Sequence, residues 1–205
     1  MVAFESIEEQ ILLGSLLGDG SLNLPGGCKT PRFREKHAAK QGEYLRWKAE
    51  NLSSLGPKVR DTTTLSFGVR RPIVSLLTGC KPSLTSLYEA FYSGGTKVVP
   101  QSLIWRLTAL GLAVWYMDDG THHQRLGFSC LYTQSFTDAE NEWLAERFFP
   151  TRFNLYPKVN HRKSNRVPNS KPHSYLKFLK PEAKHLIELV KPHIHPTLVY
   201  KMGQS

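Results

Sequence analysis

The sequence has few cysteines and no long apolar run. Its three cysteines, Cys28, Cys80 and Cys130, are widely separated and form no CxxC pair, which argues against a disulfide framework and a structural zinc site. The longest apolar stretch, 103–117, is shorter than a bilayer span and contains Arg106. The first ten residues start acidic, so we expect no cleavable leader. These absences favour a reduced, intracellular setting, either a bacterial cytoplasm or an organelle such as a chloroplast or mitochondrion.

Acidic residues are also fewer than basic residues. The chain has 17 Asp and Glu against 27 Lys and Arg, a formal charge of +10, while 40% of its residues are hydrophobic. The apolar content is enough to bury a core, and the positive charge favours a polyanionic partner because phosphate contacts release counterions. No Walker loop, zinc-finger spacing or Ser-His-Asp signature suggests another chemistry. We therefore expect a folded protein that binds nucleic acid and not a membrane.

The chain repeats itself after about one hundred residues. The segment LLGSLLGDG at 12–20 is echoed by LAVWYMDDG at 112–120, and both are typical of apolar helices that stop at Asp-Gly. Lys-Pro then opens a helical apolar pattern at 81–91 and another at 180–190. Matching features in the same order indicate a duplicated chain.

Each half also contains a predicted middle helix and short strands. The middle helices are expected at 41–55 and 137–149, and strand character appears at 32–37, 64–69, 127–132 and 174–179. Chain breakers between Ser93 and Pro100 indicate a linker. The prediction is an α+β fold with the order αββαββα in each half, the first half at 1–92, the linker at 93–101 and the second half at 102–205.

The two Asp-Gly helix ends are the strongest chemical signal. Small residues Gly14 and Gly18 allow another helix to approach closely, and the equivalent helix at 107–118 has the bulk to fill that space. If the two helices pair, Asp19 and Asp119 emerge together. Such a carboxylate pair needs a neutralising cation, and its hard oxygen ligands suit Mg²⁺ that also accepts phosphate oxygens. This pattern indicates phosphodiester hydrolysis.

A structural interpretation of these aspartates stays open. Each Asp-Gly could be only a helix stop, with glycine supplying the left-handed residue. An aspartate at a helix C-terminus opposes the helix dipole, however, and a duplicated chain would make this unfavourable choice twice.

The two repeats resemble the defining motifs of the LAGLIDADG homing endonucleases, specifically the monomeric members with two motifs. The resemblance covers essentially the whole chain, since 133–137 (TQSFT) and 199–201 (VYK) are also similar to that branch. It implies motif helices at the interface of the two halves and two saddle-shaped antiparallel sheets across duplex DNA. It also implies cleavage of both strands of a long target, with Mg²⁺ or Mn²⁺ as cofactor.

The resemblance further implies roles for individual residues. Asp19 and Asp119 match the catalytic metal ligands, and Gly18 and Asp118 match residues whose backbone carbonyls approach the metals. Lys97 matches a lysine that faces the cleaved phosphates, and Lys201 matches its symmetry-related partner. A lysine there could stabilise charge on the phosphorane, although each could instead be an ordinary solvated lysine. One departure is that Val114 stands where Gly14 would repeat, so we expect an asymmetric helix pair.

Basic residues outline a candidate DNA surface. In 32–36 (RFREK), period-two alternation places Arg32, Arg34 and Lys36 on one sheet face, where they could read a major groove or simply form a solvated charged face. The other candidate DNA-binding residues are Arg70, Arg71, Gln134, Arg162, Lys163, Arg166 and Lys171.

Alternative chemistries and functions remain. His122 and His123 follow the second motif and could suggest a histidine metal site, but adjacent side chains diverge on a strand. An RNA maturase that binds its host intron could use the same scaffold, with intron RNA as its partner, and so could a DNA-binding protein that does not cleave. Retention of both aspartates and both lysines favours cleavage.

Overall fold

The structure, a computed structural model, describes residues 6–66, 68–163 and 172–203. The first half consists of α1 (Ile7–Leu17), β1 (Ser21–Asn23), β2 (Arg32–Ala38), α2 (Gly42–Asn51), β3 (Lys58–Ser66), β4 (Val69–Leu77) and α3 (Thr85–Phe91). Helix α1 begins at Ser6, whose side chain accepts a hydrogen bond from the Glu9 backbone N–H at 3.2 Å. A short hairpin, β5 (Tyr92–Ser93) and β6 (Thr96–Lys97), follows α3.

The second half repeats this order. Its elements are α4 (Ala109–Asp119), β7 (Gly120–His123), β8 (Phe128–Leu131), α5 (Asp138–Trp143), the π-helical turn η5 (Leu144–Phe148), α6 (Phe149–Phe153), β9 (Lys158–Arg162), β10 (His173–Phe178), α7 (Lys180–Val190) and the 3-10 helix η7 (Pro196–Met202). Helix α5 begins in a capping box, because the Thr137 side chain accepts from the Glu140 N–H and the Glu140 carboxylate accepts from the Thr137 N–H. The elements α5, η5 and α6 together provide the predicted middle helix.

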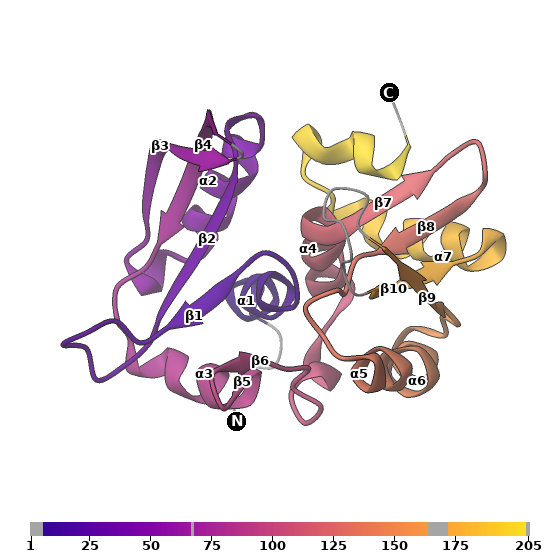
Figure 1. Ribbon diagram of the computed structural model, residues 1–205, viewed down its shortest axis with the longest axis horizontal. Coiled ribbons are helices and arrows are strands. Elements are labelled where there is room, and N and C mark those ends of the chain that lie inside the picture. Colours follow the sequence, from indigo (N-terminus) through magenta and orange to yellow (C-terminus); the bar gives the residue numbers. More distant parts are fainter. Residues whose placement is uncertain (1–5, 67, 164–171, 204–205) are drawn as a thin grey trace.

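The two sheets have the same topology. The first has the strand order β1-β2-β4-β3 and the second β7-β8-β10-β9, and every neighbouring pair in them is antiparallel. In Figure 1 the sheets lie on opposite sides of α1 and α4, which are neighbours at the centre of the molecule. The predicted duplicated αββαββα fold, with two saddle-shaped antiparallel sheets and a central pair of motif helices, is therefore confirmed.

Helices α1 and α4 pack against each other at Gly14. Both helices are buried, from Gln10 in α1 and from Gly111 in α4. A Cβ atom on Gly14 would lie 2.3 Å from the Gly111 carbonyl oxygen and 2.7 Å from the Val114 Cβ. The backbones therefore approach more closely than any side chain at Gly14 would allow, and the valine fills the space opposite the glycine, as the asymmetric motifs predict.

Some predicted element boundaries are wrong. The segment 64–69, predicted to be one strand, instead contains the end of β3 and the start of β4, because Ser66 pairs with Val69 in a hairpin. The middle helix predicted at 41–55 ends at Asn51 and gives way to a 3-10 turn, Ser53–Leu55. The predicted linker also has regular structure, because the β5–β6 hairpin reaches into it through two glycines with positive φ, Gly94 and Gly95.

Candidate active site

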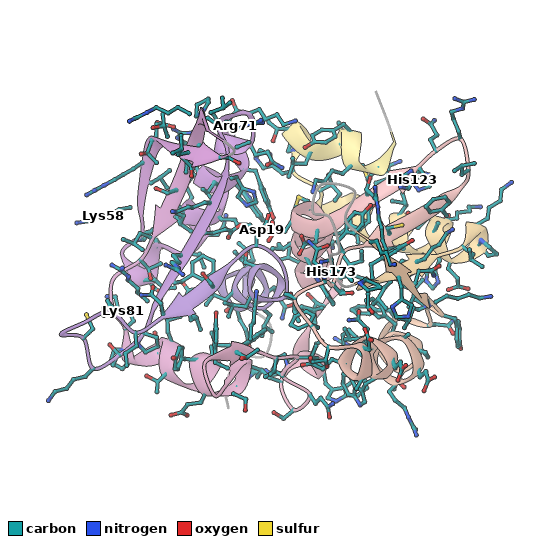
Figure 2. The ribbon with its side chains drawn as sticks, in the orientation of Figure 1. Asp19, Lys58, Arg71, Lys81, His123 and His173 are labelled. Atoms are coloured by element: carbon teal, nitrogen blue, oxygen red, sulfur yellow. The ribbon has the colours of Figure 1, made fainter. Side chains whose placement is uncertain are left out.

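The paired motif helices bring the two aspartates together. Asp19 follows the end of α1 and Asp119 is the last residue of α4. Figure 2 shows Asp19 in the centre of the molecule, between the two halves. The Asp19 side chain is 45% exposed, so it is open to a ligand from solution. Burial, followed by the charges of Asp19 and Asp118, raises the pKa of Asp119 to about 8. The Asp119 carboxyl therefore lies in a partly buried place beside two other acidic residues.

Lys97 and Lys201 lie at equivalent places beside these aspartates. The Lys97 Nζ donates hydrogen bonds to the carbonyl oxygens of Gly18 and Gly20, each at 2.9 Å. The Lys201 Nζ donates to the Asp118 carbonyl oxygen at 2.7 Å. Burial lowers the pKa of both lysines, while the nearby aspartates oppose that shift. Each ammonium is thus held at the residue that precedes a motif aspartate.

A pocket of about 370 Å³ opens beside Asp119. It is lined by Asp118, Asp119, Gly120, Tyr132, Gln134 and Lys201. Gln134, one of the predicted DNA-binding residues, is exposed in the turn that follows β8. The pocket therefore brings together one aspartate, one lysine and an amide at the surface.

A buried charge network lies beneath the Asp19 end of the site. The Lys48 ammonium, on α2, donates to both carboxylate oxygens of Asp118, at 2.9 and 3.0 Å, and to Glu35 Oε1 at 2.6 Å. The Tyr44 hydroxyl donates to Asp118 Oδ1 at 2.9 Å. Burial alone would lower the pKa of Lys48, but Asp118 and Glu35 hold it above its usual value. The lysine is therefore charged and links the two halves of the molecule.

His37 extends this network to Asp19. Its Nε2 lies 2.5 Å from Glu35 Oε1, and its Nδ1 lies 3.7 Å from Asp19 Oδ2. Burial raises the pKa of Glu35, but Lys48 and His37 outweigh it and bring that pKa to about 2. Glu35 is therefore ionised and fixes the orientation of the imidazole. Among the described residues, Asp19, His37 and Asp118 form a group of metal-ligand type whose donor atoms lie within 4.8 Å of one another.

The site residues predicted from the sequence do not include Glu35, His37, Tyr44 and Lys48. A signal for them exists. The alternation that turns Arg34 outward on β2 turns Glu35 and His37 inward beside the buried Phe33. Tyr44 and Lys48 likewise stand at helical spacing with the buried Leu45. A polar residue at a predicted core position indicates either an ion pair or a functional site.

Gly18 and Asp118 were predicted to act alike through their backbone carbonyls, but only Asp118 has a side chain that enters the site. The Asp118 side chain points into the first half and lies over Gly18, where an added Cβ would come within 2.7 Å of the Asp118 Cβ. Both backbone carbonyls that the resemblance assigned to metal approach accept a lysine hydrogen bond in this structure. A carbonyl oxygen has two lone pairs, so such a bond leaves one for a cation.

The first sheet presents a basic outer face. Arg34 and Lys36 are exposed and Arg32 is partly so, which confirms the predicted alternation on β2. Arg34 and Lys58 are both register partners of Leu77, and Lys36 and Arg60 are both partners of Ser75, so these cations share the face. Figure 2 shows Lys58 and Arg71 away from Asp19, along that sheet.

The remaining predicted DNA-binding residues have mixed positions. Arg70 and Arg71 are exposed at the start of β4, and Arg162 and Lys163 are exposed at and after the end of β9. Arg166 and Lys171 lie outside the described residues. His122 and His123 do not converge: His122 Nδ1 lies 2.9 Å from Ser129 Oγ, whereas the His123 ring lies against Phe128. Neither belongs to the metal-ligand group at Asp19.

A duplicated fold whose two central helices end side by side in carboxylates is the two-motif architecture that the sequence predicts. The chain belongs to the LAGLIDADG DNA endonuclease family, whose sequence profile matches residues 9–186.

Curated relatives carry two different names. RecA of Mycobacterium shimoidei is 40% identical over 115 residues, which are 55% of this chain and 25% of that protein. RecA of Mycolicibacterium fallax is 33% identical over 199 residues, 94% of this chain and 45% of that protein. The cytochrome b mRNA maturase bI2 of Debaryomyces hansenii is 27% identical over 201 residues, 95% of this chain and 72% of that protein. The chain thus spans less than half of these RecA proteins and most of the maturase.

Solved structures support the fold. The homing endonuclease I-WcaI, bound to its DNA recognition sequence, superposes with a TM-score of 0.81 at 20% identity, over 98% of this chain and 88% of that one. A variant of I-DmoI, in complex with its target DNA in the presence of Mg, gives a TM-score of 0.53 at 10% identity, over 90% of this chain and 96% of that one. No helix in the described part of the chain is long and apolar enough to cross a membrane.

Proposed function

We propose that this protein is a homing endonuclease that makes a double-strand break in a long DNA target by metal-dependent hydrolysis of phosphodiesters. One observation carries the proposal. Asp19 and Asp119 lie at the ends of α1 and α4, where the charge of Asp19 helps to raise the pKa of Asp119, and each has a lysine bound to the preceding residue's carbonyl. A structural helix stop would require neither the lysines nor the burial of an acid.

The residues at the two helix ends fit a divalent cation such as Mg²⁺ or Mn²⁺. They supply carboxylate and carbonyl oxygens, which are the ligands that these hard ions prefer. Burial first, and then the charges of Asp19 and Asp118, raise the pKa of Asp119, and a bound cation would oppose this rise. When bound, such an ion polarises a phosphate oxygen and lowers the pKa of a bound water. In this proposal Asp19 and Asp119 are the metal ligands, and the carbonyls of Gly18 and Asp118 complete the oxygen donors.

Lys97 and Lys201 would act on the phosphates themselves. The Lys97 ammonium has one N–H donor beyond the two that bind the backbone, and the Lys201 ammonium has two beyond the one that does. These donors can stabilise negative charge on a phosphorane oxygen. Burial lowers the pKa of each lysine, so each also can exchange a proton with water more readily than an exposed lysine can.

The basic sheet face would hold the DNA backbone and read its grooves. The first sheet offers Arg32, Arg34 and Lys36 on β2 and Arg70 and Arg71 on β4. The second half offers Arg162 and Lys163 at and after the end of β9, with Gln134 beside the Asp119 pocket. Arg166 and Lys171 complete the proposed DNA-binding set. The two halves, at 1–92 and 102–205 and joined by 93–101, would each cover one part of an asymmetric target as a single monomer. DNA and transcripts are intracellular, so we expect the protein in a bacterial cytoplasm or an organelle.

Cleavage of a plasmid library tests this proposal. The library carries candidate insertion sites and is incubated with the purified protein and Mg²⁺. We expect linear plasmid with the parent protein, no linear product in EDTA, and retained binding without linearisation for Asp19→Asn and Asp119→Asn. Lys184→Gln is the matched control, because Lys184 is an exposed surface lysine on α7, and it should linearise the plasmid like the parent. Equal linearisation by the parent and both aspartate variants would overturn the metal-ligand assignment.

A maturase is the second candidate, because the chain resembles a cytochrome b mRNA maturase over most of that protein's length. It would bind its host intron RNA and assist splicing. An intron-splicing assay that proceeds at the same rate with and without the protein would eliminate this activity. A DNA-binding protein that does not cleave would bind the library in Mg²⁺ and leave it supercoiled.

A further inference from the structure

Asp19 has a histidine beside it, whereas Asp119 has different neighbours. The described residues that line the pocket at Asp119 include no histidine. At Asp19, the Nδ1 atom of His37 lies 3.7 Å from Oδ2, and the His37 side chain is 2% exposed. An imidazole thus points from the buried side of β2 at an exposed carboxylate.

We infer that His37 is a direct metal ligand with Asp19, so that a metal site at Asp19 has mixed nitrogen and oxygen ligands, whereas a site at Asp119 would use oxygen alone. This inference rests on the proposed metal-dependent function and specifies its ligands. Metal–ligand bonds of about 2.1 Å that meet at about 90 to 120° separate the donor atoms by about 3.0 to 3.6 Å. The observed 3.7 Å lies just beyond the upper end of this range, so a small movement of the exposed Asp19 side chain would bring both donor atoms to one ion.

Glu35 prepares the imidazole for this role. Metal-binding histidines usually donate their second ring N–H to a carboxylate, which fixes the tautomer and the ring orientation. Here His37 Nε2 lies 2.5 Å from Glu35 Oε1, and the Lys48 ammonium binds the same oxygen at 2.6 Å. With the N–H at Nε2, the lone pair of His37 is at Nδ1, the atom that faces Asp19.

The local charges also call for a divalent ion. Three carboxyl groups, those of Asp19, Glu35 and Asp118, lie around His37, and the Lys48 ammonium binds those of Glu35 and Asp118. A divalent cation at Asp19 would balance the carboxyl group that Lys48 does not bind. Asp118 itself is held by Lys48 and Tyr44, so we assign it as a source of charge and not as a ligand of this ion.

The ligand types predict which ion is preferred. Carboxylate and carbonyl oxygens suit Mg²⁺ and Mn²⁺ alike, whereas an imidazole nitrogen adds affinity for first-row transition ions, which rises from Mn²⁺ through Fe²⁺ to Co²⁺. We therefore expect the Asp19 site to bind Mn²⁺ more tightly than Mg²⁺ and to discriminate between them more strongly than the Asp119 site does.

Pulsed EPR of Mn²⁺ added to the metal-free, full-length protein tests the inference. We expect ¹⁴N modulation from one imidazole in the parent and in Asp119→Asn, which keeps the Asp19 site. We expect none in His37→Gln or Asp19→Asn, and an affinity for Mn²⁺ that falls at least about tenfold in His37→Gln. Thermal unfolding shows whether His37→Gln is folded; if it is not, Asp19→Asn decides, because Asp19 is exposed and outside the core.

The outcomes separate this inference from the nuclease proposal. Absence of ¹⁴N modulation in the parent, or its persistence in Asp19→Asn, would overturn the imidazole ligand. If Mg²⁺ still supports plasmid cleavage that Asp19→Asn abolishes, the nuclease proposal survives that result. The reverse result, in which ¹⁴N modulation depends on His37 but no plasmid or DNA library is cut, would support the site and overturn the nuclease.

Discussion

The Lys48 ammonium of the first half donates hydrogen bonds to both carboxylate oxygens of Asp118 in the second half, at 2.9 and 3.0 Å. Both side chains are completely buried. The motif residue equivalent to Asp118 is Gly18, which leaves the space that the aspartate side chain occupies. The departure from perfect repetition in the two motifs therefore creates an ion pair that joins the halves directly beneath the candidate site.

Removing the lysine should destabilise the protein strongly. Lys48→Met leaves the Asp118 and Glu35 carboxylates buried without their cation, and breaking a buried pair from one side costs about 3–5 kcal/mol. We expect a decrease of this size in the free energy of unfolding, measured by urea denaturation at neutral pH in EDTA. The control is Lys184→Met, an exposed lysine paired with Glu188 at 3.8 Å, which should change stability by less than about 1 kcal/mol. A comparable effect for the two variants would contradict the role of the buried pair.

The helix contact at Gly14 should not tolerate a methyl group. The Cβ of Gly14→Ala would lie 2.3 Å from a backbone oxygen, that of Gly111, which cannot rotate away. Overpacking of this kind costs about 1–3 kcal/mol or more. Gly26→Ala is the matched control, because a Cβ there meets nothing within 4 Å and the residue is not in the left-handed region. Equal midpoints of urea unfolding for the two variants would show that α1 and α4 are not packed this closely.

The architecture could be predicted because the same pattern of helices and strands occurs twice in the sequence. Apolar helices that stop at Asp19 and Asp119 must be buried, and their repetition makes them each other's natural partner. Strand boundaries were harder to predict. β3 and β4 are rich in β-branched residues on both sides of their hairpin, so composition does not separate the end of one from the start of the other at 64–69.

The contacts in the buried part of the site could not be predicted from the sequence, for a different reason. Inward positions for Glu35 and His37 follow from alternation along β2, and an apolar-face position for Lys48 follows from helical spacing. What these groups contact does not follow, because Asp118 is 70 residues from Lys48 in sequence and reaches it only through the packing of α4 against the first half. Local pattern identifies a buried polar residue, whereas long-range packing identifies its partner.

The stability of the metal-free protein should depend on pH through Asp119. Burial, followed by Asp19, raises the pKa of this carboxyl from 3.8 to about 8. Between these pH values the folded protein holds a proton that the unfolded chain has released, so this group's contribution to stability falls as pH rises. At pH 5 the folded parent carries a protonated Asp119 that resembles asparagine, and only about one pH unit of this range has been crossed, so parent and Asp119→Asn should differ less in their urea midpoints in EDTA than they do at pH 8.

At pH 8 the variant should be the more stable protein. We expect a difference of at least about 2 kcal/mol, since each pKa unit corresponds to about 1.4 kcal/mol. All other titrating groups are shared by the two proteins, so the change in their difference between pH 5 and pH 8 isolates Asp119. An unchanged difference would mean that Asp119 ionises normally. Added Mg²⁺ should reduce the difference at pH 8 by neutralising the carboxylate in the parent.

The outer face of the first sheet should contribute to DNA affinity through charge. Each lysine that neutralises a phosphate adds about 0.9 to the dependence of log affinity on log salt concentration. Lys36→Gln should therefore weaken binding to all duplexes at low salt and reduce that slope by about 1, measured by fluorescence anisotropy in Ca²⁺ or EDTA to avoid cutting. Lys184→Gln, on α7, should leave the slope unchanged. A parental slope in Lys36→Gln would remove this lysine from the phosphate contacts.

Because Lys97 and Lys201 occupy equivalent positions, we expect each to assist the cleavage of a different DNA strand. Lys97 binds the carbonyls on either side of Asp19, and Lys201 binds the carbonyl that precedes Asp119, so each should serve the phosphate cut at its own aspartate. Loss of one such donor typically slows a reaction about 10²–10³-fold. Lys97→Met and Lys201→Met should therefore each convert a supercoiled target plasmid to nicked circles much faster than to linear DNA, with opposite strands nicked, as sequencing of the nicked product would show. Lys184→Met should linearise the plasmid at the parent rate. If both variants nick the same strand, or slow both strands equally, the lysines do not act on separate phosphates.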